Sequence, residues 1–468
     1  MLRRLLDSPW TYFAGAGILL LVAIATQFEV RLPSRPEAPP DEIAKLRERG
    51  DLNVLFILVD TLRADRLGSY GYARPTTPNI DALAQRGLLF SHVLSQSSWT
   101  KTSMASLWTA TYPVNNGIVR FSDALPGEAV MPAELFSKAG YTTAAIWRNG
   151  WVAPNFGFDQ GFQHYVNPRP GRERARLQRK NPSGEALQGT DEDVTTSAFE
   201  FLDSYGRGRF FLYLHFMDLH QYVYDDKAEQ FGTSYSDAYD QSLNWTDRLI
   251  GAIVSRLDEI GVLERTLVVV ASDHGEAFLE HGFEGHARNL YEEVTHVPLV
   301  VSLPFRLPQG IRVDAPASNV DIWPTLLDLV GLPPLPGVDG TSLVPAVLAA
   351  GRGEAGNGAP ARQVFAHLDR RWGGGKADSD PLVSVSEGPL RLLFPVNHPE
   401  RVELYDLSSD PREQSNLAEQ RPEERERLAT LAKSHIESAR IPWGKAPTEV
   451  ELDELRLNQL RALGYVVR

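Results

Sequence analysis

Short apolar runs that end in polar residues recur along the chain. Residues 52–59 (LNVLFILV) lead into Asp60, residues 210–217 lead into Asp218, and residues 266–271 are followed closely by Asp273. Continuous apolar runs of this length, without alternation, are typical of strands that are buried on both faces. We therefore expect them to be central strands of a largely parallel sheet.

Helical patterns alternate with these runs. Residues 79–93 start as an amphipathic helix and become extended, residues 128–147 contain a helix, a stop at Gly140 and a strand, and residues 320–332 contain a short helix. Residues 294–304 add a further strand. Strands that alternate with helices predict an α/β domain whose sheet is covered on both faces.

Changes in composition mark the domain boundaries. The stretch 348–362 is rich in Gly and Ala and reads as a linker, and four short β-like runs follow it before a helical pattern. We expect a transmembrane segment at 1–28, a Pro-rich linker at 29–50 and a large α/β domain at 51–347. A smaller C-terminal subdomain with an antiparallel sheet and a helical tail should occupy 363–468.

The N-terminal segment suggests a location. Residues 10–28 are apolar over a length that can cross a bilayer, and Arg3 and Arg4 precede them. The alternative is a signal peptide that is cleaved after a small-residue site. The first reading predicts a membrane-anchored protein with its folded domain on the periplasmic or extracellular side, and the second a secreted protein.

Charge and cysteine content exclude several kinds of function. The chain of 468 residues has a formal net charge of -13, which argues against nucleic acid as a partner. It contains no cysteine, so disulfides, thiolate metal sites and cysteine nucleophiles are all excluded.

The polar residues at the strand ends form the first candidate site. Ligands of open α/β sheets bind at the carboxyl ends of the strands, where Asp60, Asp218, Asp273 and His274 are expected. Carboxylate and imidazole ligands together suit a divalent cation. His281 and His286 follow His274 in a glycine-spaced loop, and His215 and His220 flank Asp218. The alternative for this last group is structural, with His215 in the core and Asp218 capping a turn.

The hydroxyl-rich stretch 97–109 (SSWTKTSMASLWT) contains a second candidate. Its later part is compatible with a helix, so that Thr100 would lie at the helix N-terminus, where the dipole favours an anionic group. Thr100 is either an N-cap that accepts from the amide of Ser103, or a nucleophile, and the two roles do not exclude each other. Lys101 is expected beside the same anion or facing solvent.

Four segments together resemble the sulfatase branch of the alkaline phosphatase superfamily. They are residues 60–87, residues 272–301, residues 403–419 and residues 460–466, in the order that this family has. The resemblance implies an α/β/α sandwich around a large mixed, mostly parallel sheet, with a smaller C-terminal sheet. It also implies a divalent metal ion held by Asp60, Asp273 and His274, and a metal-bound nucleophile that attacks a sulfate or phosphate ester.

The chain departs from that family's pattern at the nucleophile. Sulfatases carry a Cys or Ser that is converted to formylglycine, and here Thr100 stands in its place, with Thr102 and Met104 at the positions of the motif's Pro and Arg. Thr61 replaces the second Asp of the acidic pair, and His274 replaces an Asn. These changes resemble the branch with an unmodified Thr nucleophile, which includes phosphoethanolamine transferases and phosphodiester hydrolases.

The resulting prediction is a metal-dependent hydrolase or transferase of phosphate or sulfate esters that forms a covalent intermediate on Thr100, with phosphoryl chemistry preferred. The alternatives are a sulfuric ester hydrolase and a catalytically silent, surface-anchored binding protein. One or two divalent ions are expected, with zinc or manganese favoured and calcium possible. The expected partners are an anionic ester (a small molecule, glycan or lipid headgroup) and the membrane. The expected roles are catalytic for Thr100, His286, His220 and His215, metal-binding for Asp60, Thr100, Asp273 and His274, and substrate-binding for Lys101, Ser103, Asp218 and His281.

Overall fold

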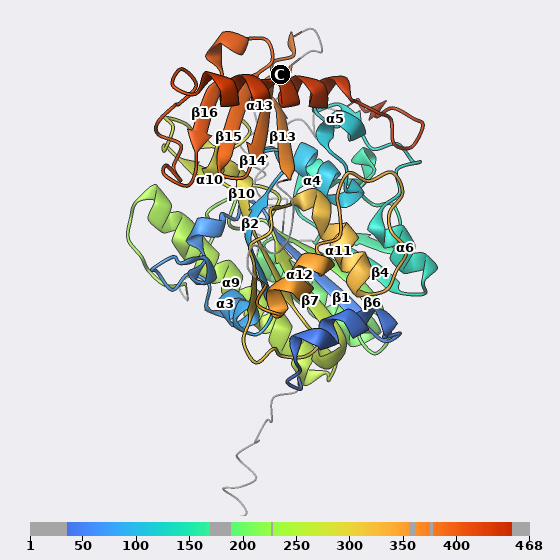
Figure 1. Cartoon of the computed structure of the whole chain (residues 1–468). Coiled ribbons are helices and arrows are strands. Elements are labelled where there is room, and N and C mark those ends of the chain that lie inside the picture. Colours follow the sequence, from blue (N-terminus) through green and yellow to red (C-terminus); the bar gives the residue numbers. More distant parts are fainter. Residues whose placement is uncertain (1–34, 169–188, 226–227, 355–361, 375–377, 452–468) are drawn as a thin grey trace, which may run out of the picture.

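A computed structural model describes residues 35–168, 189–225, 228–354, 362–374 and 378–451. A nine-stranded sheet forms its centre (Figure 1). Across the sheet lie β11 (Ile311–Val313), β2 (Leu88–Leu94), β10 (His296–Ser302), β7 (Thr266–Ala271), β1 (Asn53–Val59), β6 (Phe210–Phe216), β4 (Thr142–Ile146) and β5 (His164–Val166), while β12 (Ala317–Ser318) also pairs with β2.

The sheet is mixed and mostly parallel, as expected. β7, β1, β6, β4 and β5 pair in parallel, and β11 and β12 are parallel to β2. β10 alone runs antiparallel to its two neighbours, β7 and β2. The start of β10 therefore lies at the same edge of the sheet as the carboxyl ends of β1, β6 and β7.

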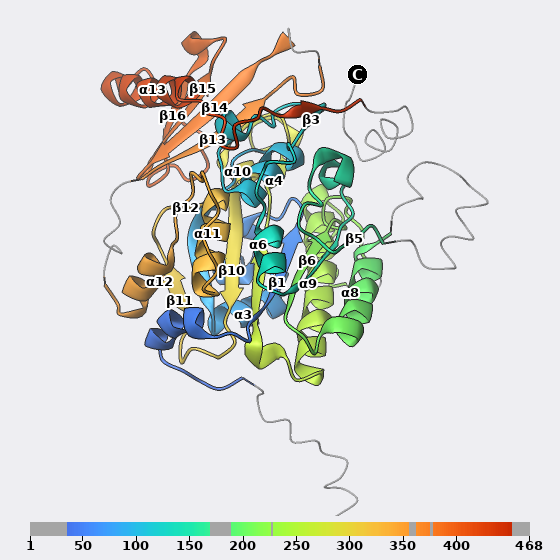
Figure 2. The same cartoon turned by 90° about the vertical axis from the view of Figure 1, so that its right-hand side faces the viewer.

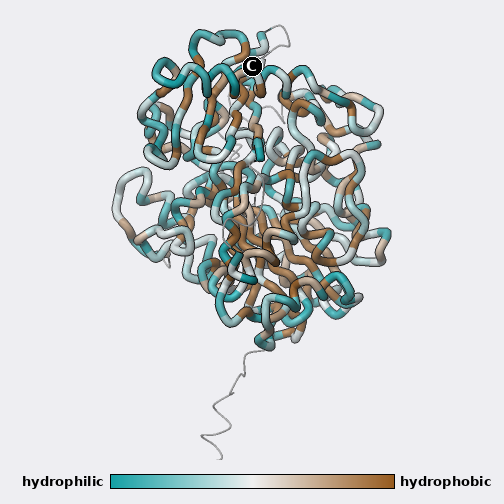
Figure 3. Tube along the Cα trace, viewed as in Figure 1, coloured by the Kyte–Doolittle hydropathy of each residue, from teal (hydrophilic) through white to brown (hydrophobic). Residues whose placement is uncertain are grey.

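Helices cover both faces of the sheet (Figure 2). Alternate residues of β1 point to opposite faces, so Val54 and Phe56 belong to one apolar cluster, and Leu55 and Ile57 to another. The first cluster is closed by α4 (Thr100–Thr109), α6 (Pro132–Lys138), α11 (Ile322–Leu329) and α12 (Val344–Gly351), and the second by α3 (Pro78–Gln85), α8 (Asp191–Tyr205) and α9 (Tyr235–Glu259). Figure 3 shows the hydrophobic residues concentrated along the central strands.

A second, antiparallel sheet forms the C-terminal subdomain at the top of Figure 1. Its strands are β13 (Gln363–Asp369), β14 (Pro381–Glu387), β15 (Leu390–Pro395) and β16 (Glu403–Asp406). Leu428 and Ala432 of α13 (Pro422–Glu437) pack on one face, against Val383 and Leu392. The smaller antiparallel sheet that the sequence predicts is thereby confirmed.

Short elements connect these parts. The helices are α5 (Pro113–Asn116), α10 (Glu292–Thr295) and the 3-10 helices η1 (Pro40–Glu48), η2 (Ala64–Arg66), η3 (Gly68–Tyr70), η4 (Gly150–Val152), η5 (Pro154–Phe156), η7 (Leu263–Arg265), η8 (Asn319–Asp321) and η11 (Pro399–Arg401). Two small ribbons pair β3 (Asp123–Ala124) with β17 (Thr448–Glu449), and β8 (Ala277–Phe278) with β9 (Glu284–Gly285).

Two predicted linkers contain regular structure. η1 lies within the stretch 29–50, and Ile43 and Leu46 are buried because their spacing of three places both on one side of the helix. α12 extends to Gly351, inside the stretch 348–362. Among the described helices, none is long and apolar enough to cross a membrane. The predicted anchor at 1–28 and the end of the helical tail, 452–468, lie outside the described residues.

Candidate active site

The chemistry-bearing residues meet at one edge of the large sheet. Asp60 directly follows β1, Asn149 follows β4, His215 lies near the end of β6, and Asp273 and His274 follow β7. All four strands are parallel, so their carboxyl ends share this edge. The structure therefore brings together Asp60, Asp273 and His274, as the sequence predicts.

The carboxylate of Asp60 is held by one oxygen only. Its Oδ2 accepts from Asn149 Nδ2 at 2.7 Å and from His215 Nε2 at 3.2 Å. Tyr213 donates its hydroxyl to His215 Nδ1 at 2.8 Å, which leaves the proton of the neutral ring on Nε2. The Oδ1 atom of Asp60 is buried and has no hydrogen-bond partner. His215 and Asn149 thus orient the carboxylate and leave Oδ1 available for a cation.

Asp273 repeats this arrangement. Its Oδ1 accepts from the backbone N–H of Thr61 at 3.4 Å, and its buried Oδ2 has no hydrogen-bond partner. Burial and the neighbouring Asp60 carboxylate raise the pKa of Asp273 well above its usual value. Two buried carboxylates with one unpaired oxygen each are costly unless a positive charge binds them.

His274 supplies the third ligand atom. Its Nδ1 donates to the carbonyl oxygen of Gly275 at 3.0 Å, so the lone pair of the neutral ring is on Nε2. Nε2 lies 3.3 Å from Asp273 Oδ2 and 3.8 Å from Asp60 Oδ1. One ligand atom from each of the three residues falls within 4.8 Å of the others. Two anionic oxygens and one imidazole nitrogen at this spacing fit a divalent cation.

Thr100 is the first residue of α4, and its hydroxyl faces this centre. Its Oγ1 lies 3.0 Å from His274 Nε2, and Asn149 Nδ2 donates to it at 3.4 Å. The residue at the N-cap position is Trp99, whose carbonyl oxygen accepts from the N–H of Ser103 at 3.0 Å. The N-cap reading of Thr100 is therefore wrong, because the helix begins one residue earlier than that reading requires.

The other polar residues of α4 make contacts within the protein. Ser103 donates its hydroxyl to the carbonyl oxygen of Asp273 at 2.6 Å, which ties α4 to the end of β7. Lys101 is fully buried: its Nζ donates to the carbonyl oxygen of Phe121 at 2.7 Å and lies 3.7 Å from the centre of the Phe156 ring. The expectation that Lys101 faces solvent is wrong. Burial lowers the pKa of its ammonium group well below the usual value.

Two further histidines adjoin His274. The ring of His286 is centred 4.5 Å from that of His274 and 4.8 Å from that of His220. His286 Nδ1 lies 3.3 Å from a carboxylate oxygen of Glu276, which is itself buried. Burial raises the pKa of Glu276 to about 7 and lowers that of His286 to about 4. The two imidazoles stand where they can contact a substrate bound at Thr100.

Asp218 and His281 lie in other interactions. Asp218 accepts from Arg148 Nη1 at 2.5 Å and from Trp245 Nε1 at 3.3 Å. His281 Nδ1 lies 2.8 Å from a carboxylate oxygen of Glu293, and its Nε2 donates to the carbonyl oxygen of Glu413 at 2.9 Å. These contacts place the Asp218 carboxylate in a buried ion pair and connect His281 to the C-terminal subdomain.

Three residues at the site, Asn149, Arg148 and Glu276, are not among those expected from the sequence pattern. Asn149 and Arg148 follow the strand at 142–146, which was predicted, so the strand-end rule could have indicated both. Glu276 follows His274 by two residues, but nothing in its local pattern indicates that it is buried beside His286.

Comparisons with known proteins agree with this geometry. The family model described as "Sulfatase" matches residues 52–332, and the C-terminal model of N-sulphoglucosamine sulphohydrolase matches residues 279–440. The chain is 24% identical to an N-acetylgalactosamine-6-O-sulfatase of Bacteroides thetaiotaomicron, over 82% of this chain and 92% of that protein. It is 28% identical to human arylsulfatase A, over 78% of this chain and 83% of that protein.

The fold has close counterparts among solved structures. The phosphonate monoester hydrolase of Agrobacterium radiobacter superposes with a TM-score of 0.68 at 21% identity, covering 86% of this chain and all of that one. The matched family region includes β1, α4 and β7, and with them Asp60 after β1, Thr100 at the start of α4 and Asp273 after β7. The match also argues against a catalytically silent binding protein. The chain therefore belongs to the sulfatase family, in the alkaline phosphatase superfamily, and is an enzyme of the sulfatase-like hydrolase type.

Proposed function

We propose that this enzyme cleaves phosphate esters, or transfers their phosphoryl group, with Thr100 as the nucleophile. The observation that carries the proposal is the position of the Thr100 hydroxyl, 3.0 Å from His274 Nε2 and beside the unpaired oxygens of Asp60 and Asp273. Threonine is not a precursor of formylglycine, so the hydroxyl itself has to react. Phosphoryl transfer to an alcohol is an ordinary reaction of such a group.

The residues that would hold the cation are Asp60, Asp273 and His274, with Thr100 as a further ligand. A divalent ion bound there supplies positive charge that favours the ionised form of the Thr100 hydroxyl and stabilises charge on the substrate oxygens. An imidazole ligand favours zinc, and manganese and calcium are compatible with the two carboxylates.

Residues of the protein carry the transfer of the phosphoryl group, its release and the stabilisation of its negative charge. In the first step the phosphoryl group moves from the ester oxygen to Thr100 Oγ1, Thr100 loses its proton to solvent, and the leaving oxygen gains one. His286 and His220 adjoin His274 and are placed to donate hydrogen bonds to that oxygen, while the proton comes from solvent. In the second step water, or an acceptor alcohol, attacks phosphorus and loses a proton to solvent, the bond between phosphorus and Thr100 Oγ1 breaks, and Oγ1 regains a proton. The N-terminus of α4 stabilises the anionic group throughout.

A sulfuric ester hydrolase is the second candidate. The family match and the names of the relatives favour it, since one relative is a sulfatase of a 6-O-sulfated sugar and another is an arylsulfatase. The same metal and nucleophile would serve, because sulfate and phosphate esters have similar size and charge distribution. The substrate would then be a sulfated glycan or small molecule.

Side-by-side kinetics test the proposal. Metal-loaded wild-type protein is assayed with bis(p-nitrophenyl) phosphate and with p-nitrophenyl sulfate, and we expect the higher kcat/KM on the phosphodiester. Thr100→Ala should lose about 10³-fold or more in kcat on either substrate. Thr102→Ala, which removes a neighbouring buried hydroxyl of the same helix, is the matched control and should retain activity.

Mass spectrometry of acid-quenched protein gives a second readout. A phosphoryl adduct on the peptide that contains Thr100 is expected during turnover. A clear preference for the sulfate ester would favour the second candidate, and full activity of Thr100→Ala would show that both mechanisms are wrong.

A further inference from the structure

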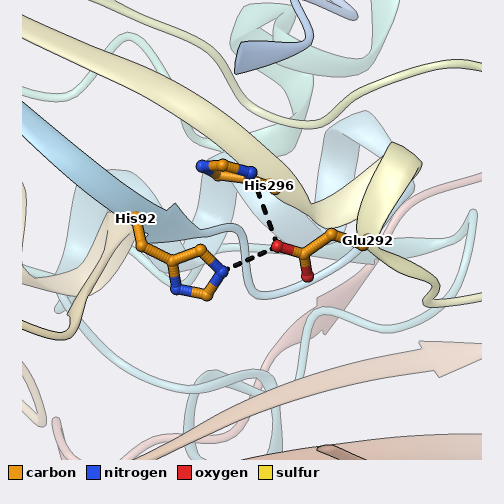
Figure 4. A group of neighbouring side chains, drawn as sticks. All are labelled: His92, Glu292 and His296. Carbon is orange, nitrogen blue, oxygen red and sulfur yellow. Dashed lines mark hydrogen bonds and ion pairs between the residues drawn. The ribbon is translucent and has the colours of Figure 1, made fainter. Parts of the chain in front are cut away.

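A second group of potential metal ligands lies away from Thr100. His92 of β2, Glu292 of α10 and His296 of β10 point toward one another (Figure 4), and we call these three residues the junction cluster. Ligand atoms of the three lie within 4.8 Å of one another. β10 and β7 separate β2 from β1, so at roughly 4.8 Å per strand spacing β2, which carries His92, lies about 14 Å across the sheet from β1, which Asp60 follows.

A β-bulge brings the two histidines together. Val93 pairs with Val297 and Phe90 pairs with Leu299, so two residues of β2, Ser91 and His92, stand opposite the single residue Pro298. Proline has no N–H to donate to the ladder, which favours the interruption at this point. The extra residue changes the direction of the His92 side chain. The imidazole ring of His92 is centred 4.7 Å from that of His296.

Glu292 is fixed so that one oxygen faces both rings. Arg391 of β15 donates Nη1 to Oε2 of Glu292, while Oε1 accepts from His92 Nε2 at 2.7 Å and lies 3.4 Å from His296 Nδ1. A second carboxylate, that of Glu413, adjoins the same guanidinium. Two carboxylates and one guanidinium leave one negative charge for a cation to neutralise.

The tautomer of His296 makes this pocket unusual. Its Nε2 donates to the carbonyl oxygen of Ser91 at 3.2 Å, so in the neutral ring the lone pair is on Nδ1. That lone pair faces a carboxylate oxygen of Glu292, and two acceptors that face each other at 3.4 Å repel unless a proton or a metal ion lies between them. His92 would provide a second nitrogen when its neutral ring carries the proton on Nδ1, which leaves the lone pair on Nε2.

We propose that the junction cluster binds a divalent transition-metal ion of the zinc class, through one nitrogen of each histidine and Oε1 of Glu292. Two imidazoles and one carboxylate are a donor set that zinc accepts, with a fourth position left for water. The side chain of His92 is 37% exposed, so solvent can reach this position. Because Arg391 orients Glu292 from the C-terminal subdomain, the ion would strengthen the junction between the two sheets.

Zinc stoichiometry tests the proposal on the full-length protein. Chelator-treated protein is saturated with Zn²⁺, desalted and analysed for zinc per chain. Wild-type protein should carry one zinc ion more than His92→Gln, a variant chosen because His92 is partly exposed and its loss should leave the fold intact. His398→Gln, at an exposed histidine that pairs with Glu400, is the matched control and should match wild type.

A second experiment removes metal binding at the catalytic site with the substitution Asp273→Asn. In Asp273→Asn protein, the zinc that remains should belong to the junction cluster, and Zn²⁺ should still raise the unfolding temperature; both effects should vanish in the double variant with His92→Gln. This thermal readout also shows whether His92→Gln is folded. If Asp273→Asn binds no zinc, or if His92→Gln binds as much as wild type, the contact between His296 and Glu292 is an ordinary ion pair and the proposal is wrong.

Discussion

Asn149 Nδ2 lies 2.7 Å from Asp60 Oδ2, and this contact sets which oxygen of Asp60 is available to a cation. His215 shares the same oxygen, so the carboxylate is held on one side by two donors. Neither donor touches the position between Asp60 Oδ1 and Asp273 Oδ2. The contact therefore orients a metal ligand without occupying the metal position.

Asn149→Ala should weaken metal binding. Loss of a residue that orients a ligand typically costs about 10- to 100-fold in metal affinity, and we expect a decrease of that size in a calorimetric titration with Zn²⁺ or Mn²⁺. Asn155→Ala is the matched control. Asn155 lies in the same segment between β4 and β5, and its Nδ2 atom has no hydrogen-bond partner. Equal affinity of both variants would show that the contact with Asp60 has no orienting role.

Asp273→Asn should make the metal-free protein more stable. The substitution removes one of two buried negative charges whose oxygens lack partners, so we expect the unfolding temperature without metal to rise by about 1–4 °C. Added metal should then stabilise the variant much less than wild type. The measurement is a thermal melt with and without metal after chelation.

Asp247→Asn provides the contrast for that experiment. Asp247 is also buried, but its carboxylate accepts from the N–H groups of Asn79 and Ile80 at the start of α3. Here both oxygens accept hydrogen bonds, and an Asn amide would turn its NH2 group toward one of the donors, so the same change should lower the unfolding temperature. A similar response of both variants would contradict the view that the Asp60–Asp273 pair is unsatisfied without a cation.

Arg148→Met should destabilise the fold strongly. The guanidinium lies between the buried carboxylates of Asp191 and Asp218, and removing it leaves two buried charges without a cation. We expect a loss of about 3–5 kcal/mol in the free energy of unfolding, measured in urea. Arg312→Met, which breaks an exposed pair with Asp314, should change it by less than about 1 kcal/mol.

His281 should stabilise the protein in a pH-dependent way. Burial alone would lower its pKa, but hydrogen bonds to Glu293 and to the carbonyl oxygen of Glu413 raise it to about 9. Because the folded-state pKa lies above the unfolded value of about 6.5, the stabilisation is complete below about pH 6.5 and is lost as the pH rises through about 9.

Urea unfolding of wild type and His281→Gln at several pH values measures this effect. The difference in unfolding free energy should be about 1 kcal/mol near pH 6, a value reduced for solvent screening, and should approach zero near pH 10. A difference that is constant with pH would mean that stacking on Tyr291, at 3.7 Å between ring centres, accounts for the contribution of His281.

Much of the fold can be predicted because its signals are local. The buried strands at 53–59 and 266–271 are continuous apolar runs, and their ends place Asp60 and Asp273 at one edge by a general rule of parallel sheets. A helix that begins close to Thr100 also follows from local sequence, although its N-cap at Trp99 does not. Family membership depends on the same motifs, so the sequence determines the class of chemistry.

Tertiary structure decided which of these residues act together. His215 and Asn149 both donate hydrogen bonds to Asp60. Asp218 forms an ion pair with Arg148, and His281 donates to the carbonyl oxygen of Glu413. His92 and Glu292 meet although 200 residues separate them, because a bulge in β2 re-aims one side chain and Arg391 orients the other. Such contacts depend on strand register and on which hydrogen-bond donors lie within reach of a buried oxygen. The spacing of residues along the chain determines neither.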